Sequence, residues 1–201
     1  MVVILIFIMP LSSYQRKKRY LMKELHLKKI KSIPQLILAL NSCEINPTEN
    51  CYLNAMRSVA ITFVEWEKYF RFNEEKPNRI RLSKTENYEL LMSCWEKGQE
   101  GPIHDIDAAE AWIHPICGNF IEERYKLTNN KLEQVSSVLL NTKSYSYMQK
   151  SKTIYKYINT YETRSVCLHL YSKPVKIWTE YDKPTGKVTV VKYKFDEILN
   201  T

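Results

Sequence analysis

Hydrophobic residues recur at helical spacing in the first part of the chain, before residue 78. Ser32-Ile33-Pro34 is a helix-start signal with proline in the first turn, and apolar residues follow three to four positions apart. A second helix is predicted with Thr48 or Asn50 as its N-cap. Two apolar stripes carry these predictions: Leu36, Ile37 and Leu40, then Leu53, Met56, Val59, Ala60 and Phe63.

The pattern changes after residue 78, where short runs rich in β-branched and aromatic residues alternate with turn signals. A spacing near ten residues between such runs is typical of a β-sandwich or barrel. Asp182–Gly186 predicts a hairpin turn between the last two strands. The predicted strands are Tyr88–Trp95, Ala111–Ile116, Asn119–Lys126, Leu132–Leu140, Tyr155–Ile158, Arg164–Tyr171, Val175–Thr179 and Val188–Lys194.

One predicted strand, Arg164–Tyr171, alternates with a period of two. Successive side chains of a strand point to opposite faces, so Cys167, His169 and Tyr171 share one face. A thiol, an imidazole and a phenol together suit the wall of a pocket, although a polar row facing solvent fits the same pattern. Periodicity leaves both interpretations open.

Charge is concentrated at one end of the chain. The net charge is +8, and residues 16–31 hold eight basic side chains and one acidic one, so the rest is close to neutral. This predicts a basic N-terminal arm, not a surface that binds nucleic acid. Glycine-rich nucleotide-binding motifs do not occur in the sequence, which excludes the common nucleotide-binding classes.

Met1–Leu11 is an apolar run interrupted by Pro10. A helix needs about 20 apolar residues to span a bilayer, and the run also lacks the leading basic residues of a secretory signal. We expect residues 1–31 to be an extension outside the fold, with Met22 as a second plausible start, and residues 32–201 to form a single domain. A membrane anchor is the alternative interpretation of the run, but we expect a cytoplasmic monomer without a membrane partner.

Five cysteines are present: Cys43, Cys51, Cys94, Cys117 and Cys167. Their number is odd and no C-x-x-C spacing occurs. Without a convincing secretory signal, reduced thiols are expected instead of a disulfide framework.

Several motifs together resemble the cysteine dioxygenase family over about residues 32 to 195. The resemblance implies a cupin β-barrel preceded by short helices, and oxidation of the L-cysteine thiol to a sulfinate by O₂ at a mononuclear Fe(II) held by three histidines. The motifs are Glu65-Trp66-x-Lys68-Tyr69-x-x-Phe72, Cys94-Trp95, Gly101-x-Ile103-His104-Asp105, Gly118-Asn119-Phe120, Leu168-His169-Leu170-Tyr171-Ser172-x-Pro174 and Asp182-x-x-Thr185-Gly186.

The iron-ligand positions that the resemblance implies are only partly filled by histidine. His104 stands at the first position, while the second holds Ile106, which has no donor atom. For the third position, one anchoring of the motif selects Tyr155 and another selects Ile154. A phenol has an intrinsic pKa of about 10, so Tyr155 is a costly iron ligand without a strong positive neighbour.

The resemblance also assigns the substrate side of the site. Arg79 corresponds to the arginine that pairs with the substrate carboxylate, with Arg81 as the fallback, and a guanidinium fork suits that role. His169 and Tyr171 correspond to the family's outer-shell histidine and catalytic tyrosine. Cys167 takes the place of a serine near the substrate.

Two further family positions have changed. Ala111 stands where animal members carry the cysteine that crosslinks to the tyrosine, so we expect no thioether here. Pro77 replaces a tyrosine that often accompanies the substrate arginine.

Three other side chains are candidates for a rebuilt metal site: Asp107, Glu110 and His114. Asp107 and Glu110 are both out of phase with the two-residue period of a strand, although a β-bulge corrects such a phase.

Three functions remain open at this point. The first is a cysteine dioxygenase relative with weak or absent activity and iron poorly held or absent, because two ligand positions lack histidine. The second is an active thiol dioxygenase whose metal site is rebuilt from His104 with Tyr155, Glu110 or Asp107. The third is a small-thiol-binding or interaction protein that docks through its basic arm.

Overall fold

The structure, a computed structural model, describes residues 29–129, 131–149, 153–192 and 194–198. The chain forms two compact units, Met1–Ile61 and Thr62–Thr201, each of which is described separately below. Most of the basic arm lies outside the described residues, so its role and the boundary expected at residue 31 stay predictions. None of the described helices is long and apolar enough to cross a membrane.

The described part of the first unit, residues 29–61, contains the helices α2 (Ile33–Ile45) and α3 (Cys51–Arg57). Helix α2 begins at the predicted place, because the Ser32 side chain accepts a hydrogen bond from the Gln35 amide at 3.4 Å. The second predicted helix is shorter than expected and ends at Arg57, because Val59 forms a parallel bridge with Ile30 instead.

The cysteine prediction is wrong at one pair. Cys43 and Cys51 form a disulfide that joins the last turns of α2 to the first residue of α3. Cys94, Cys117 and Cys167 are free, as expected.

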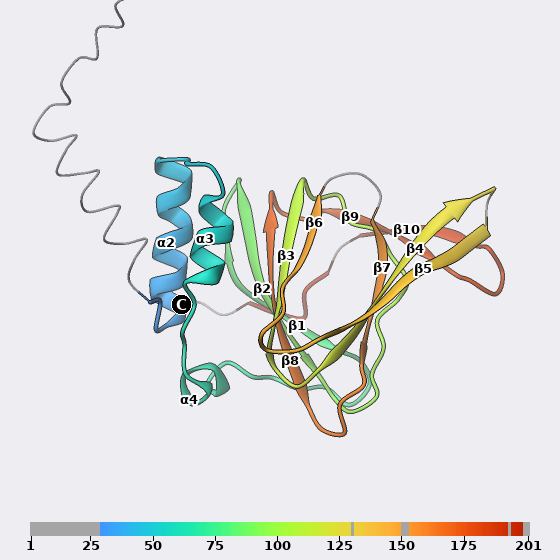
Figure 1. Cartoon of the computed structure of the whole chain (residues 1–201), viewed down its shortest axis with the longest axis horizontal. Helices are drawn as coiled ribbons and strands as arrows, with labels where there is room; N and C mark the ends of the chain where they lie inside the picture. Colours follow the sequence, from blue (N-terminus) through green and yellow to red (C-terminus); the bar gives the residue numbers. More distant parts are fainter. Residues whose placement is uncertain (1–28, 130, 150–152, 193, 199–201) are drawn as a thin grey trace, which may run out of the picture. The chain divides into compact units, whose positions relative to one another are not determined.

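The second unit opens with the short helix α4 (Phe63–Glu67) and continues almost entirely as strands (Figure 1). The strands are β1 (Asn78–Lys84), β2 (Tyr88–Trp95), β3 (Glu110–Cys117), β4 (Phe120–Thr128), β5 (Lys131–Leu140), β6 (Ser146–Gln149), β7 (Ile154–Asn159), β8 (Ser165–Ser172), β9 (Ile177–Tyr181), β10 (Val188–Lys192) and β11 (Glu197–Ile198).

The strands form two layers of a barrel. One layer is a six-stranded sheet in the order β11-β1-β2-β8-β3-β6. The other consists of β5-β4-β7 and the hairpin β9–β10, and the chain around His104 links these two parts. The His104 amide donates to the Tyr155 carbonyl in β7 at 2.9 Å, and the Tyr181 amide in β9 donates to the Ile103 carbonyl at 2.9 Å.

Two glycines close turns of this barrel. Gly186 has φ +68° in the β9–β10 hairpin, where its amide donates to the Asp182 carbonyl at 2.8 Å, so the predicted turn is confirmed. Gly118 has φ +73° between β3 and β4, and a Cβ atom there would lie 1.9 Å from Ser165 Oγ. Only glycine fits this close approach of two chain segments.

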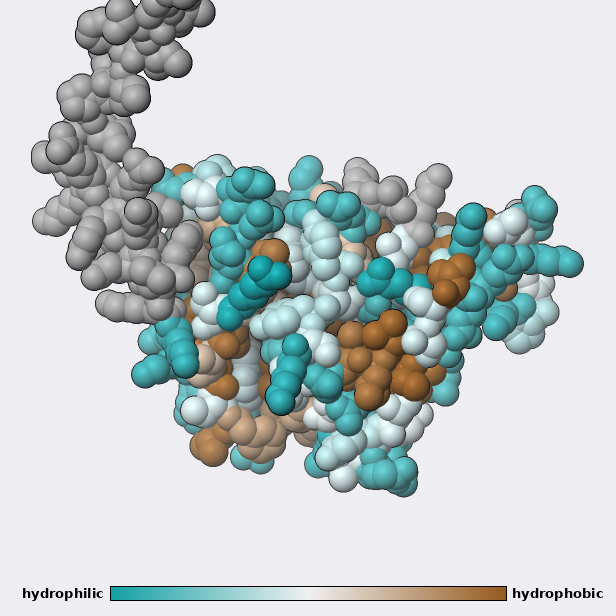
Figure 2. Space-filling model, in the orientation of Figure 1, coloured by the Kyte–Doolittle hydropathy of each residue, from teal (hydrophilic) through white to brown (hydrophobic). Residues whose placement is uncertain are grey.

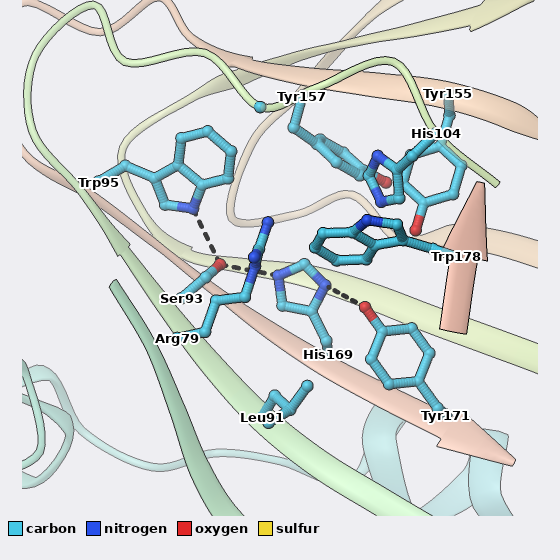
Figure 3. Close-up of a pocket in the computed structure, with 11 residues that line it drawn as sticks. Arg79, Leu91, Ser93, Trp95, His104, Tyr155, Tyr157, His169, Tyr171 and Trp178 are labelled. Atoms are coloured by element: carbon cyan, nitrogen blue, oxygen red, sulfur yellow. Dashed lines mark hydrogen bonds between the residues drawn. The ribbon is translucent and has the colours of Figure 1, made fainter. Parts of the chain in front are cut away.

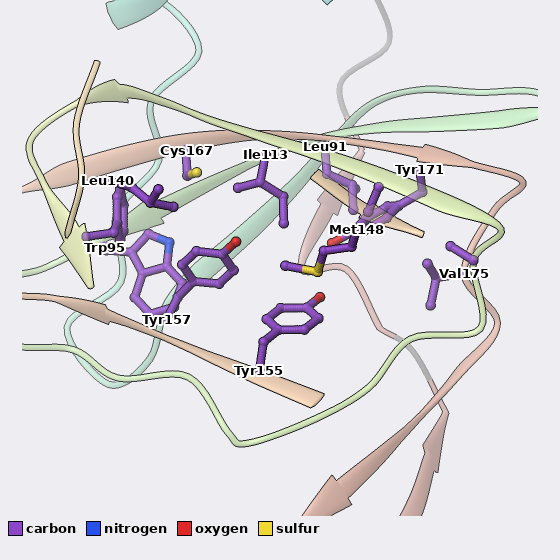
Figure 4. Close-up of a cluster of buried hydrophobic side chains, with 13 residues drawn as sticks. Leu91, Trp95, Ile113, Leu140, Met148, Tyr155, Tyr157, Cys167, Tyr171 and Val175 are labelled. Carbon is purple, nitrogen blue, oxygen red and sulfur yellow. The ribbon is translucent and has the colours of Figure 1, made fainter. Parts of the chain in front are cut away.

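A core of buried side chains from both layers lies inside the barrel (Figure 4). Its members are Leu91, Trp95, Ala108, Ala111, Ile113, Phe120, Leu140, Met148, Tyr155, Tyr157, Cys167, Tyr171 and Val175. Further apolar side chains, among them Val135 and Leu139 of β5, lie exposed on the surface, where hydrophobic residues are visible in Figure 2. The mainly β barrel preceded in sequence by short helices confirms the predicted fold class.

Candidate functional site

Both layers of the barrel contribute to one cavity (Figure 3). Its free space measures about 30 Å³, and a water molecule needs about 10–15 Å³ on this scale, so the space suits about two waters. The lining residues are Arg79, Leu91, Ser93, Trp95, Gly101, His104, Tyr155, Tyr157, His169, Tyr171 and Trp178.

Strand register brings the six-stranded side of the cavity together. In the antiparallel ladders, Arg79 of β1 lies opposite Ser93 of β2, and Leu91 of β2 lies opposite His169 of β8. Residues two apart on a strand share a face, so Leu91 and Ser93 point inward together. His169 and Tyr171 also line the cavity, and the polar face of β8 is therefore an interior wall, not a row facing solvent.

His104 is a neutral, buried imidazole. Only 8% of the residue is exposed, and its ring packs 4.4 Å from the Tyr155 ring and 4.9 Å from the Trp178 ring, centroid to centroid. Nδ1 lies 2.9 Å from the Pro102 carbonyl, so Nδ1 carries the proton and donates it. Burial lowers the pKa of His104 to about 4, which leaves Nε2 with an unprotonated lone pair at neutral pH.

Tyr155 lies beside His104 and is 1% exposed. Alternation along β7 turns Ile154 to the opposite face, so Tyr155 is the one of the two that lines the cavity. Tyr155 also hydrogen-bonds to the Tyr171 side chain, which lowers the pKa of Tyr171, but the larger effect of burial raises it well above the usual range. Tyr171 is therefore a neutral phenol at pH 7.

A chain of hydrogen bonds fixes His169. Its Nε2 lies 2.8 Å from Ser93 Oγ, which accepts a further hydrogen bond from Trp95 Nε1 at 2.9 Å. Its Nδ1 lies 3.4 Å from the Tyr171 hydroxyl. Burial, with the charge of Arg79 as the next cause, lowers the pKa of His169 to about 3. His169 is thus a neutral link between Ser93 and Tyr171.

Arg79 is the cation of the cavity. Its guanidinium lies 4.5 Å from the centroid of the Trp178 ring, and among the described residues no carboxylate forms an ion pair with it. Arg81, the fallback, is turned to other partners: its Nη1 lies 3.8 Å from Glu89 Oε1 and its guanidinium 3.8 Å from the Phe195 ring. The geometry therefore places Arg79, not Arg81, at the cavity.

Comparison with protein families gives a match over residues 28–184 to the family described as "Cysteine dioxygenase type I". The chain belongs to this cysteine dioxygenase family. The match covers most of the chain, and the family resemblance inferred from the motifs is confirmed.

Two relatives and one solved structure illustrate what this chain is similar to. Cysteine dioxygenase type 1 of Danio rerio is 24% identical over 148 residues, 71% of this chain and 74% of that protein. The Homo sapiens protein of the same name is 25% identical over 136 residues, 65% of this chain and 68% of that protein. A double-stranded β-helix protein of Klebsiella pneumoniae, 14% identical, gives a TM-score of 0.46 over 66% of this chain and 90% of its own.

The iron-ligand positions of the cysteine dioxygenase family are not brought together here. His104 and Tyr155 both line the cavity, but Ile106 packs against the hydrophobic core and is absent from the lining. After the bridges at His104 the chain leaves the sheet, so the two-residue phase that would aim residue 106 at the same point is lost.

Cys167 and Ala111 are two further positions that the family resemblance assigns near the substrate. Cys167 is 2% exposed and packs in the core near Leu140, outside the cavity, and burial raises the pKa of its thiol well above the usual range (Figure 4). The structure therefore does not bring Cys167 to the predicted substrate site. Ala111 lies directly opposite Tyr171 in the β3–β8 ladder, and its methyl group has no sulfur with which to form a thioether.

The three candidates for a rebuilt site all lie away from the cavity. Glu110 accepts a hydrogen bond from the Tyr147 hydroxyl, and Asp107 is exposed. The Nδ1 atom of His114 lies 2.9 Å from the Ser144 carbonyl, and its ring stacks on Tyr145. Among the described residues, no group of three or more His, Cys, Asp or Glu side chains is arranged to hold a metal ion.

Sequence reasoning missed Ser93, Tyr157 and Trp178, which all line the cavity. Tyr157 shares the inward face of β7 with Tyr155, so alternation from Tyr155 identifies it. Ser93 lies in a strand that is buried at every position, so burial does not distinguish it from its neighbours. The place of Trp178 depends on the long-range pairing of β9, which the local sequence does not reveal.

Proposed function

We propose that this cysteine dioxygenase relative does not oxidise cysteine at iron, and that its cavity binds a small carboxylate instead. The observation that carries the proposal is the side-chain set around His104. Of the three positions that the family resemblance assigns to iron ligands, only His104 is an imidazole, its neighbour Tyr155 is a phenol, and Ile106 packs against the hydrophobic core.

These residues do not fit a mononuclear Fe(II) centre. Ferrous iron needs several donor atoms and favours imidazole and carboxylate ligands. Isoleucine has no lone pair, and the phenols Tyr157 and Tyr171, which line the same cavity, have pKa values that burial raises. Ionising a phenol in such a cavity costs free energy. His104 is therefore the single donor among the three positions assigned to iron ligands, and one imidazole does not hold the ion.

The substrate side of the cavity supports carboxylate binding. Arg79 presents a guanidinium with no carboxylate partner among the described residues, and a guanidinium forms charge-assisted, bidentate hydrogen bonds with carboxylates. Neutral His169 and Tyr171 lie on the same cavity and add no competing charge. The free space of about 30 Å³ restricts the ligand to a few heavy atoms unless an aromatic ring moves.

Measurements of iron content and of product formation test directly whether the chain has lost the ability to oxidise cysteine. Purified protein is loaded with ferrous iron without oxygen, desalted, and assayed for iron and for cysteine sulfinate after addition of L-cysteine and O₂. We expect far less than one iron per chain and no sulfinate above an iron-only control. One iron per chain with steady sulfinate production overturns the proposal.

A separate titration tests carboxylate binding. Acetate, L-alanine and L-cysteine are titrated into the wild-type chain by calorimetry, and then into the variants R79A and R79K. We expect at least about ten-fold weaker binding in R79A, with R79K intermediate because lysine keeps the charge but lacks the fork. Equal affinities in all three chains contradict the assignment of Arg79.

One observation favours a second candidate, an active dioxygenase with a rebuilt site. His104 and Tyr155 lie side by side, and Tyr155 hydrogen-bonds to Tyr171, so an imidazole and two hydrogen-bonded phenols lie next to one another in the cavity. If wild-type protein does form sulfinate, H104A must abolish the activity, because that imidazole is the only histidine left at a ligand position. Unchanged turnover in H104A ends this candidate.

A further inference from the structure

The helical unit carries a disulfide that the fold of the barrel does not require. Cys43 and Cys51 have Cα atoms 5.7 Å apart, and their side chains are joined. Both residues are buried, at 4% and 5% exposure. The bond encloses residues 44–50, whose stretch Pro47–Asn50 is exposed.

Helix α3 depends on this bond more than α2 does. It has seven residues, whereas isolated helices shorter than about 12 residues are marginal in water. Its N-cap, Asn50, has left-handed backbone geometry at φ 58° and forms no side-chain hydrogen bond to the first turn. The start of α3 is therefore fixed by Cys51 and its link to α2, since no side-chain cap holds it.

We propose that Cys43 and Cys51 form a reversible redox pair, oxidised by a small-molecule disulfide, and that reduction releases the first turn of α3. In the exchange, the Cys51 thiolate attacks a sulfur of the small disulfide and releases one thiolate. The Cys43 thiolate then attacks Cys51 in the mixed disulfide and releases the second. Two protein thiols are oxidised, one small disulfide is reduced to two thiols, and the protons of the protein thiols pass to the released thiolates.

The position of the pair makes exchange both selective and reversible. Opening of α3, whose first turn lacks a side-chain cap, exposes Cys51 beside the exposed Pro47–Asn50 stretch, so a small thiol reaches the bond without unfolding the barrel. The three remaining cysteines are in strands of the barrel, where burial raises the pKa of each, for Cys94 to about 12. Such thiols are protonated and exchange slowly.

The test uses the full chain in glutathione buffers that range from fully reduced to fully oxidised. Free thiols are trapped by alkylation and assigned by peptide mass spectrometry. We expect Cys43 and Cys51 to lose their labels together as the buffer becomes oxidising, and to regain them on return to reducing buffer. Persistent labels on both cysteines in oxidised buffer, or failure to regain them under reduction, overturn the proposal.

Hydrogen exchange of the same samples tests the effect on α3. We expect the amides of Tyr52–Arg57 to exchange at least about ten-fold faster after reduction, because a disulfide that closes a short loop restricts local opening. The C43S variant should match the reduced wild type in either buffer, and C94S, altered in the barrel, should behave as wild type. Equal hydrogen-exchange rates of the α3 amides in both redox states refute the proposal that the disulfide controls the opening of α3. Glutathione is too large for the cavity around Arg79, so neither result depends on the proposed carboxylate binding.

Discussion

A histidine side chain has a nitrogen lone pair that can bind a metal ion, and an isoleucine side chain has none. At position 106 the aliphatic side chain gains stability from contact with the hydrophobic core, and an imidazole there would forgo that contact for a metal. At position 155 the ring of a phenol packs at a tilt against the His104 ring, and its side chain hydrogen-bonds to Tyr171. Both changes fill space with side chains that stabilise the interior without a metal.

Restoring histidine at both positions should restore iron binding. We expect the double variant I106H/Y155H to retain at least about ten-fold more ferrous iron than wild type after anaerobic loading and desalting, because Y155H adds a donor atom beside His104. Residue 106 lies outside the regular sheet, so an imidazole there can turn from the core to a metal held by the other two. The matched control I106V/Y155F alters the same positions without adding a donor and should retain no more than wild type. Equal amounts of retained iron in the two double variants would show that the side chains at positions 106 and 155 do not reach a common metal site with His104.

Acid should destabilise the folded chain through His104. Its pKa is about 4 in the folded chain against 6.5 when exposed, so the unfolded chain takes up this proton first as the pH falls. The stabilisation is therefore complete above pH 6.5 and is lost as the pH falls toward 4. The loss between pH 7 and pH 4.5 is on the order of 2–3 kcal/mol. Urea unfolding at the two pH values measures it.

The variant H104N isolates this contribution. Asparagine has a side-chain N–H group for the Pro102 carbonyl but does not titrate, so the difference in unfolding free energy between the two pH values should shrink by that amount. The carboxyl groups are not altered by the substitution, and the burial that chiefly lowers the pKa of His169 remains, so these contributions largely cancel in the comparison. Equal pH dependence in wild type and H104N contradicts the burial of His104 as a neutral imidazole.

At the scale of elements, the strands that sequence predicts are runs rich in apolar, β-branched or aromatic residues. Strand β2, with its run of buried residues, and β8, with its clean alternation, are at the predicted places. Strand β1 was missed because arginines occupy alternate positions in it, which reads as a charged loop after Pro77. In the structure Arg79 lines the cavity and Arg81 pairs with the buried Glu89, so both arginines have partners inside the fold.

Helix α3 shows the converse limit. The apolar stripe continues to Phe63, but the helix ends at Arg57 because Val59 pairs with Ile30, a contact between residues far apart in sequence. Hydrophobic periodicity shows which positions along the chain are apolar. It gives no information about the long-range pairing that ends the helix. Sequence motifs likewise locate His104 and Tyr171, while the positions of Ser93 and Trp178 in the cavity depend on strand pairing.

The turn between β3 and β4 should tolerate no side chain at Gly118. An added Cβ would lie 1.9 Å from Ser165 Oγ, in a backbone conformation with φ +73°. We expect G118A to lower the unfolding free energy by roughly 3 kcal/mol, from strain and overpacking together. The matched control G186A has the same sign of φ, at +68°, but meets no atom within 4 Å, so it should cost only about 1 kcal/mol. Chemical unfolding of both variants measures the difference, and equal losses would refute the close contact.

At the scale of the whole molecule, the two compact units differ in what holds them together. The barrel encloses a core of buried side chains from both layers. The described part of the first unit, residues 29–61, holds the helices α2 and α3 and the disulfide between them, as expected for a segment too small to enclose a large core. The structure forms two compact units, Met1–Ile61 and Thr62–Thr201, while the single domain expected from residue 32 onward stays a prediction.

The stability of the whole molecule should not depend on metal. A metal present at 100 times its Kd adds about 2.7 kcal/mol to the unfolding free energy, and a chelator removes that contribution. Here the positions assigned to iron ligands hold packed or hydrogen-bonded side chains and the cavity has only about 30 Å³ of free space, so the proposed function predicts no such contribution. We expect the melting temperature to agree within about 1 °C with and without EDTA, and ferrous iron to raise it only in I106H/Y155H. A fall of several degrees in the wild-type chain on addition of EDTA would mean that the barrel recruits a metal through donors other than those around His104.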